Sequence, residues 1–289
     1  MKVPNIARAL TCVAALATLS TAVQAQLVAD RTQDKVAFPA FKIMGNLYYV
    51  GTVNLNSYLL TTPAGDILIN TNYEDTVPMM KASLDSLGFK WTDIKIILGS
   101  HAHIDHQSAD AMVKDLTGGA PVMVMEQDVP ALTALKGPSG KPHPIDRMLK
   151  DGDTVTLGGM TLTAHLTPGH TRGCTTWTMT VQDNGRPRNV VIVCGGLPEG
   201  TRLVNVKNYP EIADDYARGF KTYRTLNGEV FLGAHSWFFD FLGKRAKLAA
   251  NPNGPNPYID PAGYKKWVDA NETMRAKLIA DQKANPPAN

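Results

Sequence analysis

The stretch IKIILGSHAHIDHQ, residues 94–107, joins a strand-like run to a dense group of metal-binding side chains. After Lys95 its first half is apolar and β-branched, which predicts a strand buried on both faces. Its second half holds three of the seven histidines of the chain, together with one aspartate. The ends of buried strands are where α/β proteins gather functional side chains. The stretch therefore predicts a central strand of an α/β fold that ends in a metal site.

The spacing of these side chains indicates two sites rather than one. Residues two apart in extended backbone can point the same way, so His101 and His103 could bind one metal as a pair. Asp105 and His106 are adjacent in the chain, so both could turn toward a second metal. Imidazole and carboxylate together suit zinc or another first-row divalent ion.

Two distant histidines could close these sites, because each follows a strand-like run. His170 comes after residues 160–166 and a Pro-Gly turn, and His235 comes after residues 229–234. His170 would complete the site of the first pair, and His235 the site of the Asp-His pair. Three protein ligands leave a coordination position open, which is typical of a catalytic rather than a structural zinc site.

The last two histidines are expected to lie outside the metal sites. His165 falls inside a predicted strand, which favours a hydrogen-bonded residue of the core or next to the ligands. His143 falls in the loop predicted for residues 136–146, where we expect its side chain to be solvated.

Apolar runs and helical patterns alternate along the chain in two similar halves. Two such halves, packed sheet against sheet with helices outside, predict an α/β fold of the four-layer αββα type. Strands are expected at residues 46–52, 57–62, 66–71, 94–100, 121–126, 154–158, 160–166, 174–181, 189–194 and 229–234. Helices are expected at residues 76–87, 108–116, 127–135, 212–226 and 261–283.

The first 25 residues have the pattern of a secretory signal peptide. Lys2 and Arg8 precede a short apolar run, and small residues lead to a cleavage site after Ala25. The apolar run is too short to span a bilayer as an anchor. We therefore expect a periplasmic mature chain, residues 26–289, that forms one domain without a membrane anchor and is a monomer. That chain would be nearly neutral, which gives no electrostatic footprint for nucleic acid.

The motifs HAHIDH (101–106), TPGHT (167–171) and GAH (233–235) together resemble those of the metallo-β-lactamase superfamily. Longer stretches resemble subclass B3 in particular: LYYVGT, SYLLTTPAGDILINT, LTAHLTPGHTRGCTTWT, YPEIADDYARGFKTYRTL and VFLGAHSWFFD. The resemblance implies an αββα sandwich that binds two zinc ions at one edge. It also implies the same ligands that the spacing indicates, namely His101, His103 and His170 for one ion, and Asp105, His106 and His235 for the other.

One position separates the chemistries of this superfamily. Glyoxalase-like, lactonase-like and nuclease-like members usually carry an aspartate that bridges the metals, after the strand equivalent to residues 189–194. Here the run VVIVCGGLPEG, residues 190–200, has no aspartate, which favours a β-lactamase. The resemblance then implies hydrolysis of the ring amide of a small β-lactam by zinc-activated water, with Asp105 as the catalytic carboxylate that holds the second metal. A lactonase or thioesterase is the alternative, and a binding protein that has lost catalysis is a third.

Some residues near the expected site depart from the B3 pattern. Relatives usually carry a substrate-binding serine near position 195 and a tyrosine soon after it. Gly195 and Gly196 stand there instead, and they become the candidate substrate-binding residues. Gln107 follows the Asp-His pair where relatives often have glycine. The loop of residues 136–146 is shorter than expected and lacks aromatic side chains.

Two cysteines remain after Cys12 is removed with the signal peptide. A hairpin turn around Asp183-Asn184-Gly185 would place Cys174 directly opposite Cys194. Opposed strand residues have Cβ atoms close to disulfide range, and export permits the bond, so we expect a Cys174–Cys194 disulfide. The alternative is that Cys194 binds metal.

Overall fold

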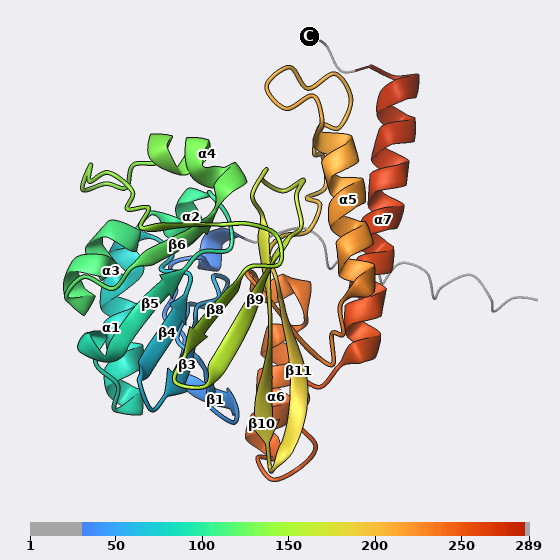
Figure 1. The fold of residues 1–289 in the computed structure, drawn as a ribbon. Helices are drawn as coiled ribbons and strands as arrows, with labels where there is room; N and C mark the ends of the chain where they lie inside the picture. Colours follow the sequence, from blue (N-terminus) through green and yellow to red (C-terminus); the bar gives the residue numbers. More distant parts are fainter. Residues whose placement is uncertain (1–30, 287–289) are drawn as a thin grey trace, which may run out of the picture.

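The computed structural model describes residues 31–286, so the predicted signal peptide lies outside the described residues. Two β-sheets pack face to face, and helices cover the outer face of each (Figure 1). The expected αββα sandwich is confirmed. Within residues 31–286, no helix is long and apolar enough to cross a membrane.

The first sheet has seven strands in sequence order, and the pairing of neighbouring strands changes from antiparallel to parallel after β4. Strands β1 to β4 run antiparallel to one another, while β5, β6 and β7 continue parallel to β4. The strands are β1 (Phe41–Met44), β2 (Leu47–Tyr49), β3 (Tyr58–Thr62), β4 (Gly65–Ile69), β5 (Ile94–Leu98), β6 (Val122–Met125) and β7 (Arg147–Leu149).

The second sheet has five strands in the order β12-β11-β10-β9-β8. It is antiparallel except for β12, which runs parallel to β11. The strands are β8 (Thr154–Leu157), β9 (Met160–Leu166), β10 (Thr175–Asp183), β11 (Arg186–Val193) and β12 (Val230–Gly233).

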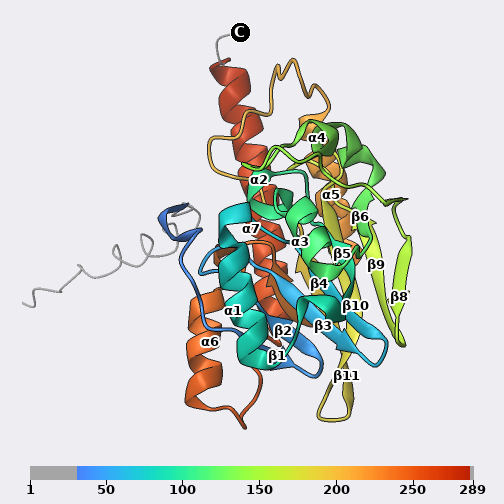
Figure 2. The same cartoon turned by 90° about the vertical axis from the view of Figure 1, so that its left-hand side faces the viewer.

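The helices form two outer layers (Figures 1 and 2). Helices α1 (Val77–Leu87), α2 (Ile104–Gln107), α3 (Asp110–Thr117) and α4 (Val129–Ala134) lie on the side of the first sheet. Helices α5 (Ile212–Thr225) and α7 (Pro261–Ala284) lie side by side against the second sheet. Helix α6 (Phe241–Ala250) packs its Phe241 against the rings of Phe41 and Tyr49.

Side chains of the first sheet point alternately to its two faces, so the sheet contributes to two hydrophobic cores. On β4, Ile67 and Ile69 face the second sheet, while Leu68 faces the helices. Successive strand residues point to opposite faces, so a strand that is apolar throughout can pack on both. The same reasoning identifies residues 94–98 as a central strand, and β5 has parallel neighbours on both sides.

Some elements differ from those that the sequence predicts. Helix α6 and the short strands β1 and β7 are not among the elements that the sequence predicts. The helix expected at residues 108–116 is α3, which runs from Asp110 to Thr117, and the short helix α2 falls in the stretch before it that we expected to be a loop. Short elements give few turns of periodicity, so contacts with neighbouring elements decide them.

The hairpin and the disulfide are both present, with a small change of register. Asn184 and Gly185 have positive φ angles of 50° and 76°, as a tight two-residue turn requires. The ladder pairs Trp177 with Ile192, so Cys174 and Cys194 stand one residue out of direct opposition, contrary to prediction. Their Cα atoms are still only 5.7 Å apart, and the disulfide joins the residue just before β10 to the residue just after β11.

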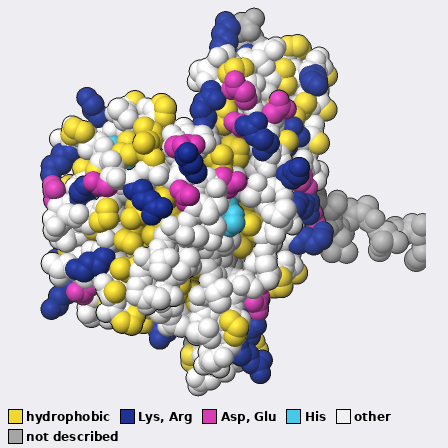
Figure 3. Space-filling view, in the orientation of Figure 1, with side chains coloured by type: hydrophobic (Ala, Val, Ile, Leu, Met, Phe, Trp, Pro, Cys, Tyr) yellow, Lys and Arg dark blue, Asp and Glu magenta, His cyan; other side chains and the backbone are white. Residues whose placement is uncertain are grey.

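The face shown in Figure 3 carries interspersed charges. Lysine and arginine side chains alternate with aspartate and glutamate, and neither sign gathers into a stripe.

Candidate metal centre

The predicted ligands come together at the ends of β5, β9 and β12. His101 and His103 follow β5 directly, and His103 is the N-cap residue of α2. Asp105 and His106 lie on α2 itself rather than in an irregular loop. One helical turn rotates them away from the preceding pair, which is how one short stretch can serve two sites.

The first group consists of His101, His103 and His170, whose nearest nitrogens all lie within 4.8 Å of one another. Their rings are edge to face, with centroids 4.5–4.8 Å apart. His101 is buried, whereas His103 is exposed. The group thus opens to solvent on the side of His103.

Hydrogen bonds orient two rings of this first group. His170 Nδ1 donates to the carbonyl of Gly196 at 3.2 Å, which leaves Nε2 as the free lone pair. His101 Nδ1 lies 3.1 Å from Ser100 Oγ, and its buried Nε2 has no hydrogen-bond partner in the described chain. A buried imidazole nitrogen without a partner is costly unless a ligand or ion meets it.

The second group consists of Asp105, His106 and His235, and it is tighter. His106 Nε2 lies 3.0 Å from His235 Nε2, and Asp105 Oδ2 lies 3.5 Å and 3.7 Å from these two nitrogens. Ligands of a tetrahedral zinc, at bond lengths of about 2.0–2.1 Å, are about 3.3 Å apart. The distances in the second group therefore match the edges of a zinc coordination shell.

The protonation states of these residues also suit a metal. Burial lowers the pKa of His106 to about 4, and burial together with neighbouring imidazoles lowers that of His170 to about 3. Burial alone would raise the pKa of Asp105, but His106, His235 and the Arg31 guanidinium outweigh it and hold that pKa well below its usual range. At neutral pH the groups thus present neutral imidazoles and one carboxylate, the forms that bind metal.

Comparisons with known proteins agree with this geometry. A sequence profile of the metallo-β-lactamase superfamily matches residues 50–182. A hydroxyacylglutathione hydrolase of Hyphomonas neptunium is 34% identical over a 212-residue alignment that covers 68% of this chain and 68% of that protein. A probable metallo-hydrolase of Burkholderia pseudomallei is 36% identical over 93 residues, 30% of this chain and 32% of that protein.

Solved structures extend the likeness to almost the whole fold. The native FEZ-1 metallo-β-lactamase of Legionella gormanii is 41% identical, with a TM-score of 0.81 over 86% of this chain and 98% of that one. BJP-1, a subclass B3 metallo-β-lactamase of Bradyrhizobium japonicum, is 36% identical, with a TM-score of 0.81 over 88% of this chain and 98% of that one. The chain belongs to the metallo-β-lactamase superfamily.

Membership in this superfamily implies a metal such as zinc, and the donor set fits one. Two groups of candidate imidazole and carboxylate ligands lie beside each other, since the ring centroids of His101 and His106 are 4.3 Å apart. Cys194 Sγ also lies 3.5 Å from His101 Nδ1, but it is in the disulfide, so it has no thiolate to offer a metal.

The two histidines expected outside the metal sites indeed lie outside both groups, but one of them is not solvated. The His143 side chain is only 2% exposed, and its Nε2 lies 2.9 Å from Asp110 Oδ2. The prediction was wrong because a composition typical of loops does not show what a loop folds back onto. His165, half-buried on β9, shares a hydrogen bond of 2.7 Å with Thr178.

A cavity of about 310 Å³ opens beside both groups in this superfamily member. One wall is apolar and includes Leu197, Pro198, Phe238 and Trp267. Trp237 also lines it and stacks on the His235 ring, with centroids 4.1 Å apart and planes 17° apart. Apolar walls with a few polar groups are typical of small-molecule sites.

Sequence reasoning missed most of these lining residues. Arg31 donates to Asp105 Oδ2 at 2.8 Å, and Asn271 on α7 accepts from the amide of Leu197 at 2.7 Å. Trp237 and Phe238 directly follow a ligand motif, which was the only available signal. Arg31 and Asn271 reach the site from the two ends of the chain, and no local pattern marks them.

Proposed function

We propose that this protein is a zinc-dependent β-lactamase, which binds two zinc ions and hydrolyses the ring amide of small β-lactams. The observation that carries the proposal concerns the turn that follows β11. This turn contacts the site, because the carbonyl of Gly196 accepts a hydrogen bond from His170. Its first residues are Cys194, Gly195 and Gly196, and none of them is an aspartate. This is the position where other chemistries of the superfamily place a carboxylate between the metals.

Six residues would hold the two zinc ions in this proposal: His101, His103 and His170 for one, and Asp105, His106 and His235 for the other. Bound zinc lowers the pKa of water to about 7 and polarises a carbonyl, which is the chemistry that opening a strained amide needs at neutral pH. Asp105 keeps its negative charge under these conditions because its pKa is held low. Its charged carboxylate would then be available to hold the second ion and to orient the water beside it.

The glycines at the end of β11 serve mainly to place His170. A Cβ on Gly195 would lie 2.6 Å from the His170 ring, so the close approach needs glycine there. The carbonyl of Gly195 accepts from Tyr223 at 3.2 Å. Gly196 lines the cavity, so of the two it is the better candidate to contact substrate.

The test is hydrolysis of a chromogenic cephalosporin, measured with and without chelator, beside a zinc count on the purified protein. We expect turnover that chelator abolishes and zinc restores, with two zinc ions per chain. A protein that binds two zinc ions but leaves several β-lactam classes intact would reject the β-lactamase proposal. A protein that binds no zinc would reject the ligand assignment itself.

A thioesterase is the second candidate, because the curated relative from Hyphomonas neptunium is a hydroxyacylglutathione hydrolase and is 34% identical. Assaying a hydroxyacyl thioester of glutathione in parallel separates the two functions. A larger kcat/KM for the thioester than for every β-lactam would favour this alternative.

We also propose that residues 1–25 direct the protein to the periplasm and are removed there, and that the mature protein is a monomer which confers β-lactam resistance. N-terminal sequencing of protein from the periplasmic fraction should begin at Gln26. Light scattering after gel filtration should give the mass of one chain, and expression should raise the inhibitory concentration of a hydrolysed β-lactam.

A further inference from the structure

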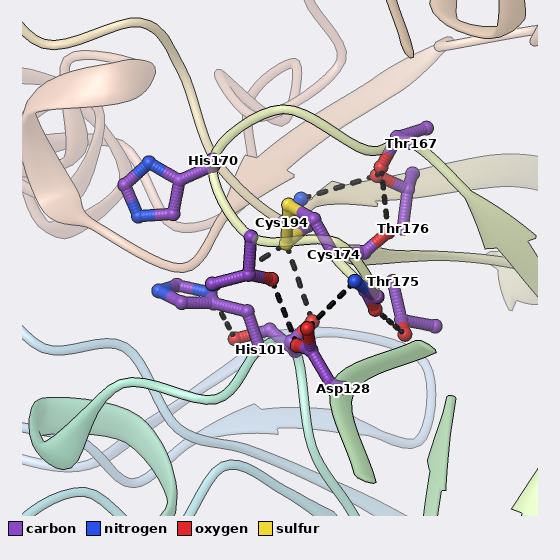
Figure 4. Close-up of a disulfide and its surroundings, with 12 residues drawn as sticks. His101, Asp128, Thr167, His170, Cys174, Thr175, Thr176 and Cys194 are labelled. Atoms are coloured by element: carbon purple, nitrogen blue, oxygen red, sulfur yellow. Dashed lines mark hydrogen bonds between the residues drawn. A yellow bond between two sulfur atoms is a disulfide. The ribbon is translucent and has the colours of Figure 1, made fainter. Parts of the chain in front are cut away.

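Asp128 is a buried carboxylate that joins the two loops of the first ligand group. It is the last residue of the 3-10 turn Glu126–Asp128, after β6, and it is only 2% exposed. Its Oδ2 accepts from the amide of Ala102 at 2.9 Å and from Thr171 Oγ1 at 2.8 Å, and its Oδ1 accepts from the amide of Gly173 at 2.6 Å. Figure 4 shows the carboxylate close to the disulfide.

The partners of Asp128 lie next to the proposed ligands in the chain. Ala102 is the residue between His101 and His103, and Thr171 directly follows His170. One carboxylate therefore holds the backbone between the first two ligands and the backbone just after the third. Three hydrogen bonds of 2.6–2.9 Å to one carboxylate restrict the distance between the two loops.

Two further observations show that the Asp128 side chain serves the loops rather than its own helix. Asp128 is the N-cap residue of α4, where an aspartate normally accepts from the first amides of its own helix, yet its side chain caps none of them. Gly173 lets the carboxylate approach, because a Cβ there would lie 2.5 Å from Asp128 N and 2.7 Å from its Cγ. The side chain thus turns away from its own helix and toward the loops.

We propose that Asp128 is the positioning residue of the three-histidine site, where it sets the separation between the His101–His103 segment and His170. The inference rests on the proposed metal role of these histidines. Asp128 acts through Ala102, Thr171 and Gly173 rather than by binding metal or substrate itself.

Other contacts would keep the loops folded without Asp128. The amide of Thr175 donates to the carbonyl of Ser100 at 2.7 Å, and the Cys174–Cys194 disulfide ties the same segment to β11. Loss of the Asp128 hydrogen bonds should therefore change the spacing of the ligands more than it changes the fold. The expected defect is weaker metal binding by a folded protein.

The experiment compares three variants of the mature full-length protein. Asp128→Asn places an amide N–H where a second acceptor oxygen is needed, and Thr171→Val removes a single hydrogen bond. Asp66→Asn is the matched control, because Asp66 is also a buried aspartate, 5% exposed, but lies at the opposite end of β4 from the ligands. Zinc affinity is measured by competition with a chromophoric chelator, and ligand geometry by the absorption spectrum of the cobalt-substituted protein.

We expect Asp128→Asn to lower the affinity of one zinc site by about 10–100-fold and to shift the cobalt bands. Thr171→Val should change both in the same direction and by less, while Asp66→Asn should match the wild type. Wild-type affinity and cobalt bands in Asp128→Asn would overturn the proposal. If Asp128→Asn does not fold, Thr171→Val decides: lower affinity supports the proposal, and unchanged affinity overturns it. A wild-type protein that binds no zinc would instead reject the ligand assignment under the proposed function.

Discussion

The two groups of proposed ligands lie side by side, but they are held in different ways. In the first group, His170 Nδ1 is bonded to Gly196, His101 Nδ1 lies beside Ser100, and Asp128 joins the two loops. In the second group, the Nδ1 atoms of His106 and His235 are buried and have no hydrogen-bond partner among residues 31–286. Packing holds these two rings instead, most directly through the Trp237 ring on His235.

This difference predicts unequal affinities for metal. A hydrogen bond to the distal nitrogen selects the tautomer and the ring orientation before the metal arrives, and losing such a partner typically costs 10–100-fold in affinity. Arg31 adds to the inequality, because its guanidinium bonds to the Asp105 oxygen that would bind the second ion. The first group should therefore fill first and empty last.

Removing a ligand from each group should have the largest effect. We expect His170→Ala to lose the tightly bound zinc and to lower kcat/KM by more than about 100-fold, beyond what loss of an outer hydrogen bond causes. His235→Ala should retain one tightly bound zinc. The zinc content of dialysed protein and the steady-state kinetics measure both effects. If His170→Ala retained one tightly bound zinc and His235→Ala lost it, the predicted order of affinities would be wrong.

Titration of the metal-free wild type should show two unequal steps. We expect the first zinc to bind about 10–100-fold more tightly than the second, because among residues 31–286 the first group has hydrogen-bonded Nδ1 atoms and the second has none. Isothermal calorimetry with zinc, or cobalt absorption followed step by step, measures the ratio. Two equal affinities would show that packing orients the rings as well as hydrogen bonds do.

Removing the disulfide should affect stability more than metal choice. The bond closes a loop with a sequence separation of 20 residues. Replacing Cys174 and Cys194 by serine should lower the free energy of unfolding by about 3 kcal/mol. Urea unfolding of the metal-free protein measures this loss, and denatured, unreduced wild type should show no free thiol. Two reactive thiols in the wild type would contradict the pairing.

Acid should destabilise the metal-free protein through both groups. The pKa of His170 is lowered to about 3 and that of His106 to about 4, from an ordinary value of 6.5, mainly by burial. The unfolded chain therefore binds protons below about pH 6.5 that the folded chain excludes, so this stability is complete above that pH and is lost as the pH falls toward 4. We expect a loss of at least about 2 kcal/mol between pH 7 and pH 5, measured by urea unfolding. Constant stability across this range would show that the imidazoles are not desolvated.

The smallest expected effect tests packing in the second group. Trp237→Ala removes the ring stacked on His235, a contact worth about 1 kcal/mol, so the second zinc should bind about fivefold more weakly. The affinity of the first zinc should not change. A Trp237→Phe variant keeps an aromatic ring and should lie between the two. An equal loss at both sites would show that Trp237 supports the cavity as a whole.

Local patterns predicted the scaffold and the candidate ligands of this protein. Buried β-branched runs identified the central strands, as residues 94–98 show, and the spacing of SHAHIDHQ indicated two ligand groups before any fold was considered. The hairpin at Asn184-Gly185 brings the cysteines within disulfide range as predicted, although the predicted register of the two strands was wrong by one residue. Each of these features depends on residues that are neighbours in the chain or in one hairpin.

Contacts between distant segments were decided only by the tertiary structure. Arg31, Asp128 and Asn271 carry no local signal, and His143 looked solvated although it is buried against Asp110. Their roles depend on which loops meet when the two sheets pack and bring their strand ends to one edge. The sequence alone thus determined which side chains could bind metal and after which strands they lie. Packing determined which other residues hold those side chains in place, because the partners of a buried polar group are chosen by space rather than by sequence distance.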